Sequence, residues 1–191
     1  MMSFDRRIEM LHCDARRQLT VYALCAAALA SVAADATAKD KFEPLVGTAQ
    51  ITEMLVVPSP DGACQATAEH PGLTATGKIA GQGLGTPIGS FAITSVDCIR
   101  SDVPGQFFPP FAFSSSTLTL TARNGDQLVA SYSGTGTLSP LGLLVLTGRY
   151  TISSGTGAYR NAGGSGSLSG VEDISTQPAR GFVTLSGQIT R

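Results

Sequence analysis

The 191-residue sequence is poor in charged residues and contains no tryptophan. Only 14% of its residues are Asp, Glu, Lys or Arg, and its formal net charge at pH 7 is −1. Proteins that bind nucleic acids or anionic membrane surfaces present clusters of Lys and Arg, which this composition does not provide. We therefore predict no nucleic-acid partner.

Motifs for metal, cofactor or nucleophile chemistry are also scarce. His70 is the only histidine after residue 38 and stands in a turn-like Ala-Glu-His-Pro-Gly segment, so neither a zinc site nor a hydrolase triad is expected. The residues from Gly155 begin like a dinucleotide-binding loop, but Arg160 occupies the place of its third glycine and no helical pattern follows. The segment 166–170 has Leu168 where an esterase-type turn would carry its nucleophilic serine. The sequence thus predicts no metal and no cofactor.

The first 38 residues have the layout of a secretory signal peptide. Four arginines (Arg6, Arg7, Arg16 and Arg17) precede an uncharged run of 17 residues, 18–34, and the small residues Ala36, Thr37 and Ala38 follow it. We predict a helical signal peptide over residues 1–38, cleaved on export to the periplasm or the exterior. A membrane anchor is one alternative, but the run is shorter than the about 20 apolar residues that span a bilayer, so no stable membrane insertion is expected after cleavage. Twin-arginine export and lipidation at Cys25 are further alternatives.

Two of the four cysteines, Cys64 and Cys98, follow the predicted leader. Oxidising compartments favour disulfides, and two cysteines have one possible intramolecular pairing. We predict a disulfide between Cys64 and Cys98. The alternative is a pair of separate buried thiols.

Apolar and polar residues alternate in eight segments after residue 38, and no amphipathic helix pattern is present there. The candidate strands are residues 48–57, 73–81, 91–99, 117–122, 127–134, 144–152, 165–171 and 183–190. Asn124-Gly125 is a strong hairpin signal between two of them. This pattern predicts an all-β fold with a single domain over residues 39–191.

An eight-stranded antiparallel β-barrel is the predicted architecture, with a β-sandwich as the alternative. We prefer the barrel because closure removes the exposed strand edges that so few charged residues would leave unprotected. An outer-membrane barrel would need aromatic girdles, whereas residues 39–191 contain three tyrosines and no tryptophan. We therefore expect a soluble barrel.

Two acidic residues alternate with apolar neighbours in the candidate strands. Glu53 shares strand parity with Ile51, and Asp97 shares it with Ile99. If these faces point inward, burial would raise the pKa of each carboxyl and equip it for proton transfer. The simpler interpretation, which we prefer, is that both acids lie near strand ends and face solvent, or that a bulge shifts the strand register.

Tyr132 and Tyr150 point inward by the same parity rule. Their hydroxyls could orient a ligand, or the rings could fill the core with one satisfied hydrogen bond each. Core packing is the preferred role. Together with Glu53 and Asp97, these tyrosines are the catalytic candidates.

Four phenylalanines stand beside Pro109 and Pro110 in the segment 104–113, which we predict to be a loop at the mouth of the barrel. They are Phe107, Phe108, Phe111 and Phe113. Burying each ring contributes about 2 to 3 kcal/mol, so the loop should cover apolar surface. It could plug one barrel mouth, form a lid over an apolar ligand or form a partner surface, and the plug is preferred because barrel ends need covering in any case.

The glycine-rich segment 155–170 predicts a strand, a tight corner and a returning strand, with Tyr159 as a packing anchor. Residues 155–164 read Gly-Thr-Gly-Ala-Tyr-Arg-Asn-Ala-Gly-Gly. This run resembles the glycine pattern of dirigent proteins and allene oxide cyclases, and residues 73–191 are similar to uncharacterised bacterial exported proteins with the same barrel. The resemblance implies an eight-stranded barrel and the cyclisation or stereochemical guidance of an apolar substrate inside it. The polar pocket residues of the plant families have no match in this chain.

Two functional hypotheses follow. The first is an exported, soluble barrel that binds a small apolar molecule or serves as a structural or interaction module, without turnover. The second is a cofactor-free isomerase or cyclase that uses Glu53 or Asp97 as acid or base and a tyrosine to position the substrate. A filled interior would leave only a structural module, whereas a cavity with either acid on its wall would favour the enzyme.

Overall fold

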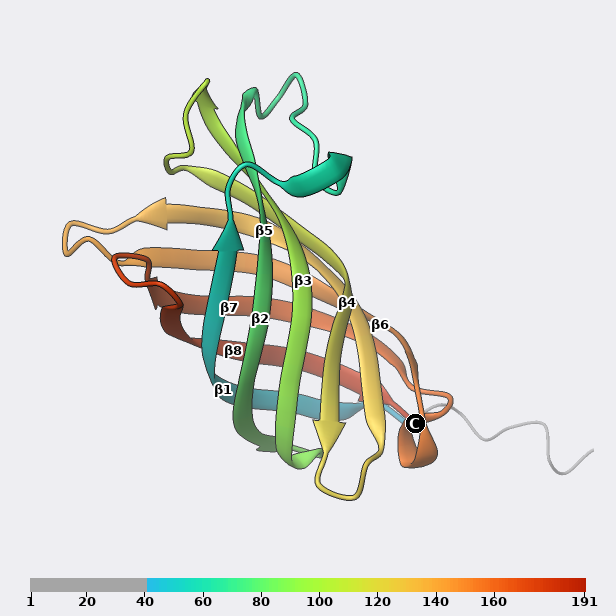
Figure 1. Ribbon diagram of the computed structural model, residues 1–191. Coiled ribbons are helices and arrows are strands. Elements are labelled where there is room, and N and C mark those ends of the chain that lie inside the picture. The colour runs from blue at the N-terminus through green and yellow to red at the C-terminus, as the bar shows by residue number, and fades with distance from the viewer. Residues whose placement is uncertain (1–40) are drawn as a thin grey trace, which may run out of the picture. The chain divides into compact units, whose positions relative to one another are not determined.

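The computed structural model describes residues 41–191, which form a closed barrel of eight antiparallel β-strands (Figure 1). The strands follow one another around the barrel in chain order, and β8 pairs with β1 to close it. Their bounds are β1 Glu43–Val56, β2 Gly72–Thr86, β3 Gly89–Pro104, β4 Phe111–Ala122, β5 Gln127–Leu138, β6 Leu144–Gly155, β7 Gly163–Asp173 and β8 Ala179–Thr190. The green strands at the front of Figure 1 cross the orange and red strands behind them steeply, as strand tilt in a closed barrel requires.

Two single-turn 3-10 helices, η1 (Pro60–Gly62) and η2 (Gly157–Tyr159), interrupt the connections. None of the helices described between residues 41 and 191 is long and apolar enough to cross a membrane. The predicted signal peptide, residues 1–38, lies outside the described residues.

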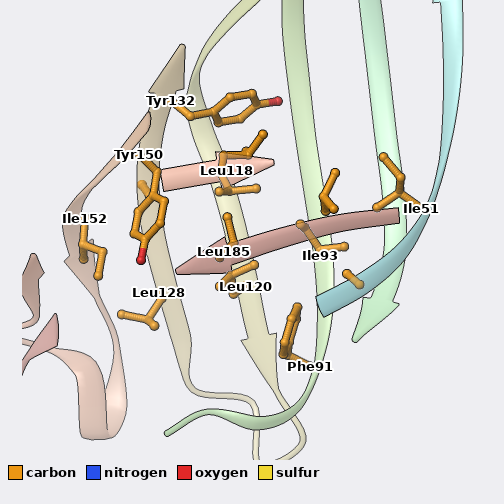
Figure 2. Packing of buried hydrophobic residues seen from close by; sticks show 14 of the residues in the cluster. Ile51, Phe91, Ile93, Leu118, Leu120, Leu128, Tyr132, Tyr150, Ile152 and Leu185 are labelled. Carbon is orange, nitrogen blue, oxygen red and sulfur yellow. The ribbon is translucent and has the colours of Figure 1, made fainter. Parts of the chain in front are cut away.

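The alternation that predicted the strands also determines which side chains fill the barrel. In β3 the buried residues recur at every second position, from Phe91 through Ile93 to Ile99. The same holds in β5, where Leu128, Ala130 and Tyr132 are buried and Val129 and Ser131 between them are more exposed. Figure 2 shows Phe91, Ile93, Leu128 and Tyr132 pointing into a common interior. The prediction of an eight-stranded antiparallel barrel is confirmed.

The segment 104–113 is a correction to the sequence prediction. Only residues 105–110 connect the strands, because β3 includes Pro104 and β4 begins at Phe111. Phe111 and Phe113 are buried strand residues that pair with Gly136 and Gly134 of β5. These glycines carry no side chain, so the two rings have room on the inner face. The prediction that Phe111 and Phe113 lie in a loop was therefore wrong.

The glycine-rich segment forms the corner between β6 and β7, as predicted, and Tyr159 is buried within it. The corner is braced by the neighbouring β4–β5 turn. The Asp126 carboxylate accepts a hydrogen bond from the Ala158 amide (3.0 Å), and the Thr156 hydroxyl oxygen accepts one from the Gln127 amide (2.9 Å). The two turns at this end of the barrel thus hold each other in place.

Gly157→Ala is expected to lower the free energy of unfolding by about 2 kcal/mol, measured by urea denaturation. Gly157 has φ +55°, a left-handed conformation that disfavours a side chain, and an added Cβ would collide with the Asp126 carboxylate. Gly163→Ala is the matched control, since the atom nearest its added Cβ, Thr190 Oγ1, lies 3.4 Å away. Equal losses in the two variants would contradict this explanation.

Candidate functional site

The barrel interior is filled at one end and hollow towards the other. The filled part lies near the β2–β3 and β4–β5 turns, where Phe91, Leu120 and Leu128 are buried in the same core cluster (Figure 2). Towards the end where β1 ends and β2 begins, a cavity of about 70 Å³ remains. Its wall is mostly apolar and includes Ile51, Ile93, Phe113, Leu118, Leu144 and Leu168.

Four partly buried apolar residues form the rim of this cavity: Leu55, Phe107, Leu146 and Ile174. They come from β1, the β3–β4 connection, β6 and the β7–β8 connection, all at the same end of the barrel. The rim is therefore the side from which a ligand would enter.

Three carboxyl groups interrupt the apolar wall. Glu53 of β1, Asp97 of β3 and Glu172 of β7 all line the cavity and are 5%, 6% and 2% exposed. The expectation that Glu53 and Asp97 face solvent was wrong, because both strands continue past these residues and keep their alternation. The inward orientation required by strand parity is the one observed.

Glu172 was missed in the sequence because the predicted strand ended at Val171. Strand β7 continues to Asp173, which places Glu172 on the same face as the buried Leu168. The spacing of four residues between Leu168 and Glu172 was the available signal, but Ser169 and Gly170 between them weakened the apolar pattern.

Asp97 is held by a hydroxyl network. Its Oδ1 accepts hydrogen bonds from the Tyr132 hydroxyl and from Ser95 Oγ (3.2 Å), and Ser95 Oγ also lies 2.9 Å from Ser115 Oγ. A register shift in the β4–β5 pairing, between Ser115 and Leu118, lets both residues face the interior although they are three positions apart. Burial raises the pKa of Asp97 to about 6, and the hydrogen bonds from Tyr132 and Ser95 limit the rise.

Tyr132 reaches from β5 into the interior above Leu118 (Figure 2). Its pKa is raised, first by burial and then by the adjacent Asp97 charge, so the phenol remains a hydrogen-bond donor at physiological pH. Of the two candidate tyrosines, only Tyr132 lies on the cavity wall.

Glu53 and Glu172 form a second acidic group in the cavity. Burial raises the pKa of Glu53, and the neighbouring charges of Glu172 and Asp97 raise it further. Burial also raises the pKa of Glu172, while a hydrogen bond with Glu53 opposes that rise. The pKa of Glu53, raised to about 9, keeps this carboxyl protonated at neutral pH, so its proton lies next to Glu172.

One oxygen of each glutamate, Glu53 Oε1 and Glu172 Oε1, has no hydrogen-bond partner within residues 41–191. Gly77 of β2 makes the room for Glu53, because a Cβ at Gly77 would collide with its carboxyl group. Among the described residues that line the cavity, none is Lys, Arg or His. The cavity is therefore acidic, and residues 41–191 place no basic counter-charge on its wall.

Tyr150 lies outside the cavity wall. Its ring covers Gly166 and Gly187, where an added Cβ atom would lie 2.6 Å from its hydroxyl oxygen in each case. Burial raises the pKa of Tyr150 to about 12, and the hydroxyl has no hydrogen-bond partner in the described chain. The ring packs the filled part of the interior (Figure 2).

The four phenylalanines separate into different positions. Phe107 lies at the rim and stacks on Phe111, with ring centroids 4.7 Å apart, while Phe111 and Phe113 line the cavity from β4. Phe108 is 53% exposed and does not line the cavity. Ser101 Oγ anchors the connection by donating to the Phe108 carbonyl (2.6 Å) and accepting from its amide (3.2 Å).

Cys64, Cys98 and His70 lie away from the cavity lining. Cys64 and Cys98 are within disulfide-bonding distance, with Cα atoms 5.1 Å apart, so the predicted pairing is observed and fastens the β1–β2 loop to β3. His70 Nδ1 lies 2.5 Å from Asp102 Oδ1 and adds a second tie between the same segments. No group of three or more His, Cys, Asp or Glu residues within 41–191 is arranged to hold a metal ion.

The acids of β1, β3 and β7, the phenol of β5 and the apolar rim thus form one site, and its arrangement suits the binding of a small molecule and the holding or moving of a proton. A comparison of the chain with protein-family models, curated proteins and solved structures finds no match in any of the three.

Proposed function

We propose that this protein binds a small, mainly apolar molecule in the cavity at the rimmed end of the barrel. One observation carries the proposal: the interior is not filled there, and an apolar wall surrounds a few convergent polar groups. Concave, mostly apolar sites with a small number of placed polar groups are the usual form of small-molecule sites in proteins. Binding without catalysis needs no residues beyond those of this cavity wall.

A second candidate function is a cofactor-free isomerase or cyclase. The observation that favours it is the combination of the protonated Glu53–Glu172 pair with Asp97 and Tyr132 on one cavity wall. A carboxyl group with a raised pKa can donate a proton near neutral pH, and a neighbouring carboxylate can accept one. Tyr132 would position the substrate by its hydroxyl.

We infer that the chain is exported after removal of residues 1–38, and the pairing of Cys64 with Cys98 supports an oxidising destination. We also infer kinship with the allene oxide cyclase and dirigent-like barrels. The closed eight-stranded barrel and the glycine corner between β6 and β7 support that kinship.

Methyl NMR of protein labelled at Ile and Leu tests the binding function. Titration with 1-hexanol is expected to shift the methyl signals of Ile51, Ile93 and Leu118, which line the cavity, and not that of Leu84, which is 68% exposed outside it. Leu146→Trp, which fills the rim, should abolish these shifts. A spectrum of the unsubstituted protein that changes with neither 1-hexanol nor hexylamine would reject the binding function.

Molecules that co-purify with the exported protein, identified by native mass spectrometry, distinguish the two candidate functions. When the isolated compound is returned to the protein, binding alone leaves it unchanged. An isomerase would convert it, and Glu53→Gln together with Asp97→Asn would stop the conversion. Conversion that persists in that double variant would contradict a role for these acids.

A further inference from the structure

The two unpartnered oxygens in the cavity indicate what the ligand must offer. Glu53 Oε1 and Glu172 Oε1 belong to side chains that are 5% and 2% exposed, and both side chains line the cavity. A buried acceptor without a donor destabilises the protein by about 1 to 3 kcal/mol, and by more when it is charged. A ligand that brings hydrogen-bond donors to these two atoms would remove that penalty.

The charge of the cavity selects among such donors. Its wall contains Glu53 from β1, Asp97 from β3, Glu172 from β7 and the Tyr132 phenol from β5. The other strands contribute only apolar residues to the wall: Ile79 of β2, Phe111, Phe113 and Leu118 of β4, Leu144 and Leu146 of β6, and Val183 of β8. Buried acids without a basic partner are complementary to a cationic group.

The size of the cavity and the apolar rim above it limit the shape of a cationic ligand. A volume of about 70 Å³ accommodates an ammonium group and a few carbon atoms; a dry cavity that binds benzene is about twice as large, roughly 150 Å³. The remainder of a longer ligand would lie between the apolar rim residues Leu55, Phe107, Leu146 and Ile174. The site therefore suits a molecule that is charged at one end and hydrocarbon at the other.

We propose that the ligand is a small amphipathic primary amine, whose ammonium group binds between Glu53 and Glu172 while its hydrocarbon part occupies the rim. This inference rests on the proposed binding function and specifies its ligand class. An ammonium group carries three N–H donors, enough for both unpartnered oxygens. The Asp97 charge adds attraction while its Oδ1 remains engaged by Tyr132.

Binding of the amine is coupled to release of a proton. In the empty cavity the raised pKa of Glu53 keeps its carboxyl protonated at neutral pH. The ammonium group favours the ionised pair, so the O–H bond of the carboxylic acid breaks and the proton passes to the buffer. The affinity for the amine should therefore rise about tenfold per pH unit while one proton is released, as long as the amine itself stays protonated.

Titrations of the purified protein with hexylamine and with 1-hexanol, at pH 6, 7 and 8, test the inference. Methyl NMR and calorimetry in buffers of different ionisation enthalpy report affinity and proton release. We expect hexylammonium to bind at least tenfold more tightly than hexanol at pH 8, to weaken as the pH falls and to release close to one proton. Hexanol should show no pH dependence.

The double variant Glu53→Gln/Glu172→Gln should lose the preference for the amine and still bind hexanol, which shows that its cavity remains formed. Glu69→Gln removes an exposed acid outside the cavity and should change neither affinity. The pH profile of the unsubstituted protein is an independent readout that needs no variant. Equal affinities for hexylamine and hexanol, or a preference for hexylamine that persists in the double variant, would contradict the proposal that the ligand is an amine. Binding of neither compound would overturn the binding function as well.

Discussion

Glu53→Gln is expected to increase the free energy of unfolding at pH 8 by several kcal/mol. The unfolded chain ionises this side chain with a pKa near 4.5, whereas the folded protein raises that pKa by burial and by the charges of Glu172 and Asp97. Each pH unit above the unfolded pKa adds about 1.36 kcal/mol to the cost of keeping Glu53 protonated in the folded protein. Because pH 8 is 3.5 units above 4.5, this cost is at most about 5 kcal/mol at pH 8. A glutamine side chain at this position has no such penalty, and its amide can donate to Glu172.

The sign of the pH dependence follows from the raised pKa. Below pH 4.5 both folded and unfolded chains hold the proton, so Glu53 contributes no pH-dependent penalty there. As pH rises, the unfolded chain loses its proton first, and stability falls until the folded carboxyl also ionises. Asp97 acts in the same direction between its usual 3.8 and about 6. The unsubstituted protein should therefore be more stable near pH 4.5 than at pH 8.

Urea denaturation of the two proteins at pH 4 and pH 8 measures the effect. The gain from Glu53→Gln should be large at pH 8 and small at pH 4, while Glu69→Gln, at an exposed position, should show neither. A stability gain of the same size at both pH values would mean that packing, and not ionisation, is responsible. A loss at pH 8 would contradict the assigned proton on Glu53.

Removal of the disulfide is the second large effect. Replacement of Cys64 and Cys98 by serine is expected to lower the free energy of unfolding by about 4 kcal/mol, the loop-closure value for a sequence separation of 34 residues. The bond joins the β1–β2 loop to β3, and its loss leaves that loop attached mainly by bonds such as Arg100 Nε to the Gln65 carbonyl (2.7 Å). The barrel strands themselves keep their pairing.

Chemical denaturation of the double serine variant provides the measurement, and the unsubstituted protein with reductant should show the same loss. Mass spectrometry without reductant should find Cys64 joined to Cys98. Two free thiols in exported material, or a loss below about 1 kcal/mol, would contradict the predicted contribution of the bond. Hexanol binding should survive in the variant, because neither cysteine lines the cavity.

Much of the fold could be predicted because strand alternation is a local property. The buried faces around Phe91, Leu128 and Leu185 follow from residues two apart in the sequence, and the prediction holds for them. Strand ends were less predictable where glycine replaces apolar residues, as between Gly81 and Thr86. Phe111 and Phe113 were misplaced because the nearby prolines obscured a short alternating pattern.

The candidate site was likewise predictable from the sequence only in part. Sequence parity by itself determined that Glu53, Asp97 and Tyr132 share faces with apolar residues, and that Cys64 has one partner. Only the tertiary structure decided that Glu53 and Asp97 meet Glu172 in one cavity. These acids come from β1, β3 and β7, and their meeting depends on barrel closure and inter-strand register, which residues distant in the chain set together. Whether side chains fill that space depends on the packing of the whole interior, which no local pattern records.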